Sequence, residues 1–124
     1  MYKIRYHMVL VVKYRKRMLS DSRRVTMLMD TLKGITERYD IVFETVGTDG
    51  DHVHIFVGAA PRYAPARVMQ IVKSITARRL FREFPVIREE LWGGEFWSDG
   101  GYIGTVGDGV TIEDFEKPLI AGHI

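Results

Sequence analysis

Strand-like and helix-like segments follow one another along this chain in an order that few folds accept. The predicted strands cover residues 4–12, 41–46 and 52–57, with a further one in the stretch 93–109, and the predicted helices cover residues 21–39 and 65–84. The first strand ends in a run of five apolar residues, Met8–Val12, as expected of a strand in the middle of a sheet. The order βαββαβ predicts an α+β fold of the ferredoxin-like (RRM-like) type, an antiparallel sheet with both helices on one face.

Glycine dominates the last third of the chain. The stretch 93–109 holds 7 of the 12 glycines, and we expect a hairpin there, or one strand with loops. It contains no Gly-x-x-x-x-Gly-Lys-Ser/Thr motif, so it is not a P-loop. An amphipathic pattern from about residue 111 to 117 predicts a C-terminal helix. A length of 124 residues with no linker predicts a single domain, 1–124.

Several classes of protein are excluded by what the composition lacks. The chain has no cysteine, which excludes disulfides, thiolate zinc sites and cysteine nucleophiles. No apolar run approaches the roughly 18 residues of a membrane span, and the N-terminus lacks a signal-peptide pattern. We therefore expect a cytoplasmic protein with no membrane partner.

Charge is distributed unevenly along the chain. Residues 1–82 hold sixteen Lys and Arg against seven Asp and Glu, whereas residues 83–124 hold two against nine. A basic body favours a polyanionic partner such as nucleic acid. The alternative is that both sets mix on the folded surface and cancel.

Two histidines lie two positions apart in the predicted strand 52–57. Side chains alternate between the faces of a strand, so His52 and His54 point the same way. Two neutral imidazoles side by side form half of a metal site. Asp51, Glu44 and His7 are open candidates for a third ligand or an orienting partner. The alternative is a pair of solvated histidines on an exposed sheet face.

Two groups of cations are candidate nucleic-acid contacts. Single strands bind through cationic grooves combined with aromatic platforms. The first group surrounds an aromatic ring and comprises Lys13, Tyr14, Arg15, Lys16 and Arg17; the second lies in the predicted helix 65–84 and comprises Arg78, Arg79 and Arg82. Trp92 and Trp97 are further candidates for base stacking, although buried aromatics are common in such segments. The alternative for the cations is a solvated surface, with the stem of Arg79 packed along its helix.

Five stretches, in chain order, resemble the HUH superfamily, and within it the single-tyrosine, IS200-like transposases of compact bacterial and archaeal insertion sequences. They are Tyr6-His7-Met8-Val9 leading to Lys13-Tyr14-Arg15-Lys16-Arg17, Asp51-His52-Val53-His54-Ile55-Phe56-Val57, Val72-Lys73-Ser74-Ile75-Thr76 with Arg78-Arg79, Leu91-Trp92-Gly93 to Phe96-Trp97-Ser98, and Gly101-Tyr102-Ile103-Gly104-Thr105-Val106-Gly107-Asp108. The similarity is collinear from about residue 3 to residue 117.

This resemblance implies metal-dependent cleavage and strand transfer of single-stranded DNA at insertion-sequence ends. It implies recognition of hairpin DNA, a homodimer, and Mg²⁺ or Mn²⁺ as the cofactor. Carried over, His52 and His54 are the metal ligands.

The C-terminus departs from the family pattern. The family's nucleophilic tyrosine is expected after Lys117, where this chain has Pro118. Proline has no hydroxyl, and inside a helix it costs roughly 3 kcal/mol or more. Gly122 falls where the family has a Gln that completes the metal site, with His123 beside it as a possible metal ligand. The catalytic residue is therefore unknown, and Tyr102 is a weak substitute because it matches a family position that is not the nucleophile.

Four readings of the function stay open at this point. The first is a transposase-type enzyme that acts on hairpin or single-stranded DNA, either through another tyrosine or with its natural C-terminus altered. The second is a DNA-binding relative that has lost catalysis. The third is an RNA-handling ferredoxin-like domain, which preference for RNA over DNA would reveal. The fourth is a dimeric metal-binding domain with no salt-dependent DNA affinity.

Overall fold

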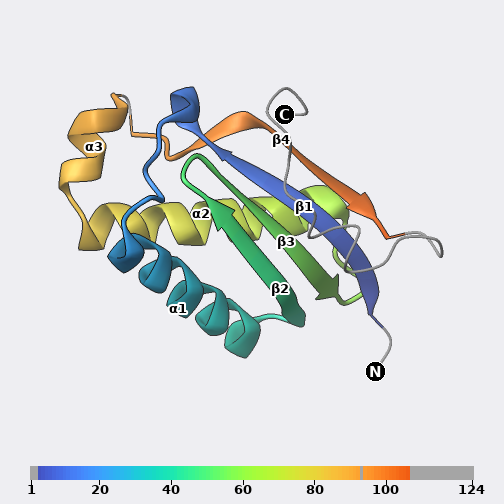
Figure 1. Cartoon of the computed structure of the whole chain (residues 1–124). Coiled ribbons are helices and arrows are strands. Elements are labelled where there is room, and N and C mark those ends of the chain that lie inside the picture. The colour runs from blue at the N-terminus through green and yellow to red at the C-terminus, as the bar shows by residue number, and fades with distance from the viewer. Residues whose placement is uncertain (1–2, 93, 107–124) are drawn as a thin grey trace.

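The chain folds around a four-stranded antiparallel sheet with the strand order β2-β3-β1-β4 (Figure 1). The computed structural model describes residues 3–92 and 94–106. In chain order the elements are β1 (Ile4–Val12), the 3₁₀ turn η1 (Lys13–Arg15), α1 (Ser22–Arg38), β2 (Ile41–Asp49), β3 (His52–Ala59), α2 (Pro65–Glu83), α3 (Val86–Leu91) and β4 (Trp97–Thr105). This is the ferredoxin-like arrangement that the segment order predicts.

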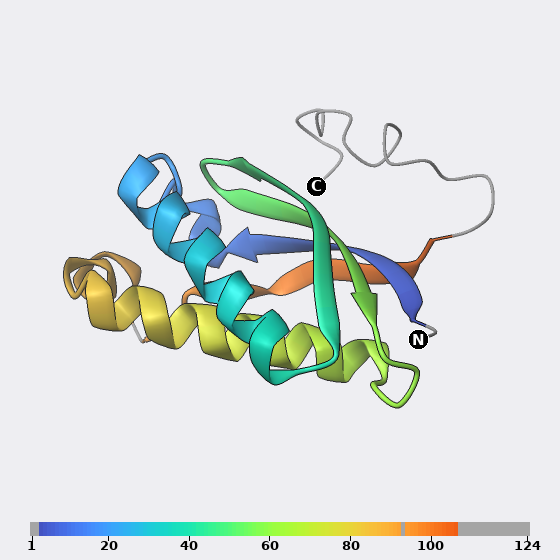
Figure 2. The same ribbon diagram turned by 90° about the horizontal axis from the view of Figure 1, so that it is seen from below.

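Both long helices cover the same face of the sheet, and Figure 2 shows α1 and α2 in front of it. The core between the layers takes alternate residues of the strands and one stripe from each helix. Its fully buried members include Met8, Leu10, Val53, Ile55, Val57, Leu28, Ile35, Val68, Val72 and Leu80. Because this face takes Val53, Ile55 and Val57, the side chains between them on β3 belong to the opposite face.

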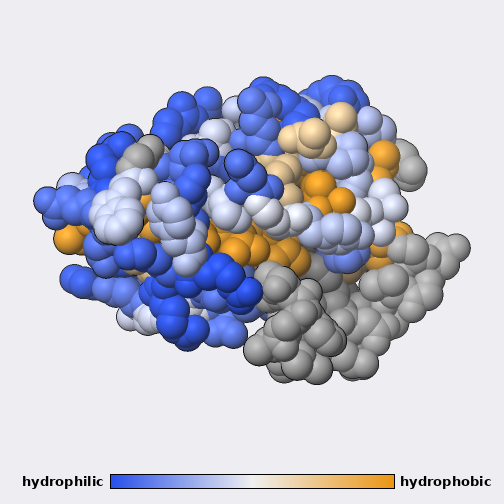
Figure 3. Space-filling model, turned by 90° about the horizontal axis from the view of Figure 1, so that it is seen from above, coloured by the Kyte–Doolittle hydropathy of each residue, from blue (hydrophilic) through white to orange (hydrophobic). Residues whose placement is uncertain are grey.

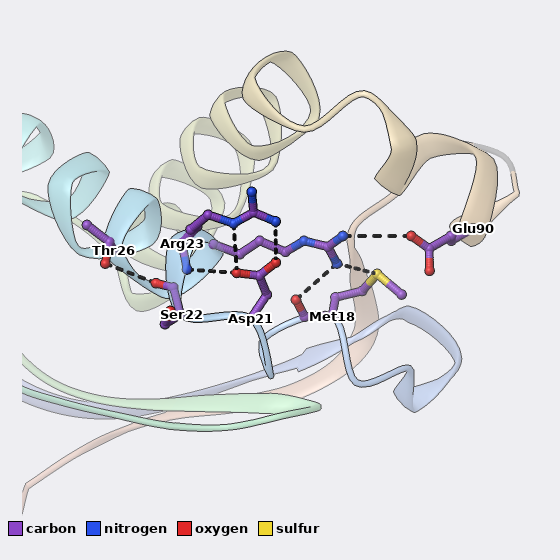
Figure 4. Close-up of polar contacts among 7 residues, drawn as sticks. Met18, Asp21, Ser22, Arg23, Thr26 and Glu90 are labelled. Atoms are coloured by element: carbon purple, nitrogen blue, oxygen red, sulfur yellow. Dashed lines mark hydrogen bonds and ion pairs between the residues drawn. The ribbon is translucent and has the colours of Figure 1, made fainter.

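The start of α1 is fixed by an N-cap. The Asp21 carboxylate accepts a hydrogen bond of 2.8 Å from the Arg23 backbone N–H, and its second oxygen pairs with the Arg23 guanidinium at 3.0 Å (Figure 4). These hydrogen bonds hold the pKa of Asp21 at about 2. The neighbouring Arg24 donates to the Met18 carbonyl and lies 3.8 Å from Glu90 of α3. Charge and cap together therefore set where α1 begins.

One buried hydrogen bond ties α2 to β4. The indole Nε1 of Trp97 donates to Thr76 Oγ1 over 2.9 Å, and Thr76 in turn donates to the Val72 carbonyl over 2.6 Å. Trp97 is 5% exposed and Thr76 is fully buried. Of the two tryptophans that were candidates for base stacking, Trp97 is thus a core residue.

The last third of the chain holds one helix that was not predicted and one strand that was. Helix α3 follows Pro85 directly, and its six residues are too few for a periodic signal. The described part of the glycine-rich stretch forms the single strand β4, which is the second of the two expected arrangements. Gly101 lies inside β4 at φ +122°, and a Cβ there would be 2.7 Å from the Val9 carbonyl oxygen. This glycine therefore permits close strand approach and does not mark a turn. The helix expected from residue 111 lies outside the described residues.

Candidate metal centre and nucleic-acid interface

The face of the sheet opposite the helices carries the histidine pair. His52 and His54 lie opposite Val11 and Val9 of β1, and the two ring centroids are 6.4 Å apart. Seen from this side, apolar side chains gather along the middle of the face and hydrophilic ones surround them (Figure 3). The alternation that placed both imidazoles on one face is confirmed. The described helices do not cover them.

Asp51 links the first imidazole to the basic turn. His52 is 4% exposed, and its Nδ1 lies 2.8 Å from Asp51 Oδ1. The Arg15 Nε donates to the other oxygen of Asp51 over 3.1 Å. Burial is the largest influence on Asp51 and would raise its pKa, but the hydrogen bonds from His52 and Arg15 together outweigh burial and lower it. With Asp51 ionised, the tautomer that fits this contact has its proton on Nδ1 of His52 and a lone pair on Nε2.

The second imidazole lies against a glycine on the neighbouring strand. Gly47 of β2 is the register partner of His54. A Cβ on Gly47 would lie 2.3 Å from His54 Nε2 and 2.5 Å from its Cε1. Only glycine therefore leaves room for this ring position.

The other candidate ligands are engaged elsewhere. Glu44 forms an ion pair of 2.8 Å with Arg5. The His7 ring lies 5.1 Å from the ring of Tyr102, and burial lowers the pKa of His7. Within residues 3–92 and 94–106, no group of three His, Cys, Asp or Glu side chains is placed to hold a metal ion. The described residues therefore supply two candidate metal ligands, the imidazoles of His52 and His54.

The basic turn lies at the same end of the sheet as His52. Arg15 reaches Asp51, and Arg17 lies 3.6 Å from Asp49, the register partner of His52. Lys13 donates to Glu95 over 3.0 Å, a hydrogen bond that raises the pKa of Lys13. Tyr14 is 58% exposed. The structure thus brings the predicted residues 13–17 next to the predicted ligands.

The α2 arginines lie on the other side of the molecule. Arg78, Arg79 and Arg82 line a groove of about 540 Å³ between α1 and α2, together with Arg38. Arg79 is paired with Asp30 at 3.3 Å. Arg78 and Arg82 also line a groove of about 690 Å³ between α2 and residues 94–99. The second groove includes Glu95, whose carboxylate accepts the hydrogen bond from Lys13, but no residue of 13–17 lines it.

Three sequence candidates for catalysis or metal binding remain to be placed. Tyr102 lies on the sheet face opposite the helices, beside Val9 and so one strand away from His54. Its hydroxyl lies over Gly104, where a Cβ would be 2.3 Å away. Gly104 pairs with His7, so the phenol is turned away from the imidazole pair. Pro118 and His123 lie outside the described residues.

Two contacts at the site were not predicted from the sequence: the one between Trp92 and Tyr14, and the one between His54 and Gly47. Trp92 is 73% exposed and lies 6.4 Å, centroid to centroid, from Tyr14. Nothing in the sequence spacing separates Trp92 from the buried Trp97. The fit of His54 over Gly47 was also missed, because a glycine next to a turn is read first as part of that turn.

Comparison with known proteins agrees with this geometry. The family described as IS200-like transposases matches residues 1–117. The chain belongs to this family.

Two individual members of the family align with most of this chain. The ISDra2 transposase TnpA of Deinococcus radiodurans is 32% identical over 122 residues, which span 98% of this chain and 86% of the relative. The transposase for insertion sequence element IS200 of Salmonella typhimurium is 25% identical over 91% of this chain and 74% of its own length.

Solved structures share the fold. A crystal structure of a Deinococcus radiodurans protein assigned as a transposase superposes with a TM-score of 0.76 at 30% identity, covering 87% of this chain and 82% of that one. A REP-associated tyrosine transposase bound to a REP hairpin gives a TM-score of 0.61 at 7% identity, covering 87% and 61%. The second likeness concerns the fold alone. Among the described residues, no helix has the length and apolar character of a membrane span.

Proposed function

We propose that this IS200-like transposase binds single-stranded and hairpin DNA at insertion-sequence ends on the sheet face opposite its helices. One observation carries the proposal: two imidazoles lie side by side on a central strand, at the end where the basic turn meets the sheet. Family membership supports DNA as the polyanion. Under this proposal, the chain acts as one domain over residues 1–124 and as a homodimer.

We also propose that His52 and His54 hold a divalent metal ion. Asp51 orients the first ring and leaves its Nε2 to the ion, as carboxylates hydrogen-bonded to metal-binding histidines do. Imidazole nitrogen suits first-row transition ions, whereas Mg²⁺ takes mostly oxygen ligands. The described donors therefore fit Mn²⁺ better than Mg²⁺, and water, a DNA phosphate oxygen or His123 are the candidates for further ligands. When bound, the ion supplies Lewis-acid polarisation of a phosphate oxygen.

The described residues bind and position DNA, and none of them is placed as the nucleophile. Lys13, Arg15 and Arg17 supply cations near the imidazoles, and Arg78 and Arg82 supply cations to a separate groove beside α2. Tyr102 points away from the pair, which argues against it as the nucleophile. The alternative function is a DNA-binding relative without catalysis, because Pro118 replaces the expected tyrosine.

The decisive experiment incubates the protein with single-stranded DNA that carries the hairpin and flank of the element's own end, in the presence of Mn²⁺. Intact-protein mass spectrometry and peptide mapping then search for a covalent adduct. An adduct on a tyrosine establishes an active transposase and names its nucleophile. Tight, metal-dependent binding without an adduct establishes the binding-only relative. No binding to DNA refutes the proposal.

The metal assignment has its own test. We expect His52→Ala combined with His54→Ala to abolish Mn²⁺ binding, measured by calorimetry, because both imidazole ligands are removed. His7→Ala is the matched control, since the His7 ring lies beside Tyr102 on β4. Unchanged Mn²⁺ affinity in the double variant would refute the assignment.

A further inference from the structure

Backbone strain in this protein is concentrated at one exposed patch. Among the described residues, three non-glycine residues have positive φ: Tyr14 at 60°, Arg15 at 53° and Trp92 at 35°. Such conformations are strained for a residue with a Cβ and persist where the surroundings or a function hold them. All three lie in the turn after β1 or at the end of α3. The strained residues therefore come from two segments that are far apart in the sequence but form one local structure.

The same patch exposes two large rings. Trp92 and Tyr14 are 73% and 58% exposed, more than any other large apolar side chain described. Their centroids are 6.4 Å apart and their planes are tilted by 58°. Neither ring buries the other, so packing in the free protein does not account for their position. Exposed apolar patches of this kind mark surfaces that a binding partner covers.

Two ammonium groups lie over these rings. Lys16 Nζ is 5.6 Å from the Trp92 centroid, and Lys13 Nζ is 5.7 Å from the Tyr14 centroid. The pairing of Lys13 with Glu95 is exposed on the Glu95 side, at 62%, and such pairs are weak enough for a phosphate to replace the carboxylate. Two exposed rings with an ammonium group near each match nucleotides, whose bases stack and whose phosphates are anions. An apolar peptide would match the rings but not the charges.

We propose that Tyr14 and Trp92 form a stacking platform for two unpaired bases of a single DNA strand, with Lys13 and Lys16 contacting the flanking phosphates. The tilt gives two diverging surfaces, which suits successive bases of a bent strand better than one base held between parallel rings. This inference rests on the proposed function and assigns a subsite to it. Arg15 connects the platform through Asp51 to His52, with contacts of 3.1 and 2.8 Å. A strand stacked here therefore continues towards the imidazole pair.

Glycine substitutions provide the sharpest variants. Tyr14→Gly and Trp92→Gly remove a ring and also relieve the positive φ, so we expect an unchanged or higher unfolding midpoint. Affinity for a single strand, measured by fluorescence anisotropy, should fall about tenfold for each ring lost. Tyr14→Phe and Trp92→Phe keep a ring and should keep most of the affinity. Val86→Ala removes an exposed apolar side chain of α3 and should change nothing.

Abasic scanning separates stacking from a structural role. Each base of the strand is deleted in turn, and wild-type affinity should drop at two adjacent positions. The double variant Tyr14→Gly, Trp92→Gly should be insensitive at those two positions. If the wild type binds the strand but ring removal leaves its affinity unchanged, the platform is refuted and the proposed function stands. If the wild type does not bind DNA, or binds RNA of the same sequence more tightly, the proposed function itself fails.

Discussion

His54 and Gly47 show at the residue scale how a neighbour without a side chain can define a ligand position. The imidazole occupies the space that any Cβ at Gly47 would fill. Sequence alternation correctly placed both histidines on one face of β3, because the two-residue period of a strand leaves no alternative. The alternation did not reveal which residues position each imidazole, since the contacts of Asp51 and Gly47 depend on the register between strands.

We expect Gly47→Ala to displace the His54 ring and weaken Mn²⁺ binding at least tenfold, because a ligating atom would lie 2.3 Å from the new Cβ. Imidazole resonances of His54 should shift in NMR spectra, and calorimetry measures the affinity. Gly34→Ala is the matched control: Gly34 lies inside α1 with nothing within 4 Å of the added Cβ. It should leave Mn²⁺ binding intact and stabilise α1 by about 0.5–1 kcal/mol. Equal Mn²⁺ affinity in both variants would contradict the assignment of His54.

At the scale of elements, a buried hydrogen bond joins α2 to β4 inside an apolar core, and the contact from Lys73 to the Ser98 carbonyl adds to it. Thr76 accepts the Trp97 indole N–H and donates to its own helix. Thr31 of α1 is similarly buried, and its hydroxyl donates to the Met27 carbonyl. Removing the Thr76 hydroxyl therefore leaves the buried indole N–H of Trp97 without an acceptor, whereas removing the Thr31 hydroxyl leaves no donor unpaired in this way.

We expect Thr76→Val to destabilise the fold by about 1–3 kcal/mol, because the indole donor remains buried without an acceptor. Thr31→Val should cost less than about 1 kcal/mol, because a helix carbonyl keeps its backbone partner. Denaturant unfolding of both variants measures the difference. Similar losses would show that the indole is not held through Thr76.

The N-cap of α1 predicts a specific pH dependence. The pKa of Asp21 is lowered from 3.8 to about 2 by its hydrogen bonds to Arg23. A lowered folded-state pKa means that the stabilisation is fully present above pH 3.8 and is lost as the pH falls towards 2. Asp21→Ala should therefore lower the urea midpoint at pH 7, and its difference from the wild type should shrink between pH 4 and pH 2. A difference that is constant over this range would rule out the charged cap.

Element prediction succeeded where periodicity is long and failed where it is short. The strands 41–46 and 52–57 and both long helices were predicted close to their observed positions. Helix α3 has six residues and follows a proline, so no period could develop. The glycines of 93–109 left a hairpin or one strand open, and the close approach of the Val9 carbonyl explains why Gly101 lies within a strand. Such an approach is invisible until the neighbouring strand is known.

At the scale of the whole molecule, the two cationic groups lie on different sides. Residues 13–17 border the face that carries the imidazoles, and Arg78, Arg79 and Arg82 belong to the helix layer. Sequence analysis named both groups as DNA contacts but could not place one relative to the other. Their separation means that DNA of different lengths should use them differently.

We expect the triple variant Lys13→Ala, Arg15→Ala, Arg17→Ala to weaken binding of a single strand of about 10 nucleotides and to flatten its salt slope by about 2, since each phosphate contact contributes about 0.7. The triple variant Arg78→Gln, Arg79→Gln, Arg82→Gln should leave this short strand unaffected. With a hairpin long enough to reach the groove beside α2, both variants should lose affinity. Salt titrations with the two DNA lengths measure this, and equal effects on the short strand would place the DNA elsewhere.

The strand order has a kinetic consequence for any ion bound by the histidines. β3 and β1 each have a hydrogen-bonded neighbour on both sides, and the proposed ligands lie on β3. Amides of doubly flanked strands exchange with solvent chiefly when the whole domain unfolds, whereas turns open far more often. Deuterium exchange should therefore be slowest at residues 52–57 and fast at residues 13–17. The protein then holds its proposed metal ligands on its slowest-opening backbone and its proposed nucleotide contacts on a rim that rearranges many times between global openings.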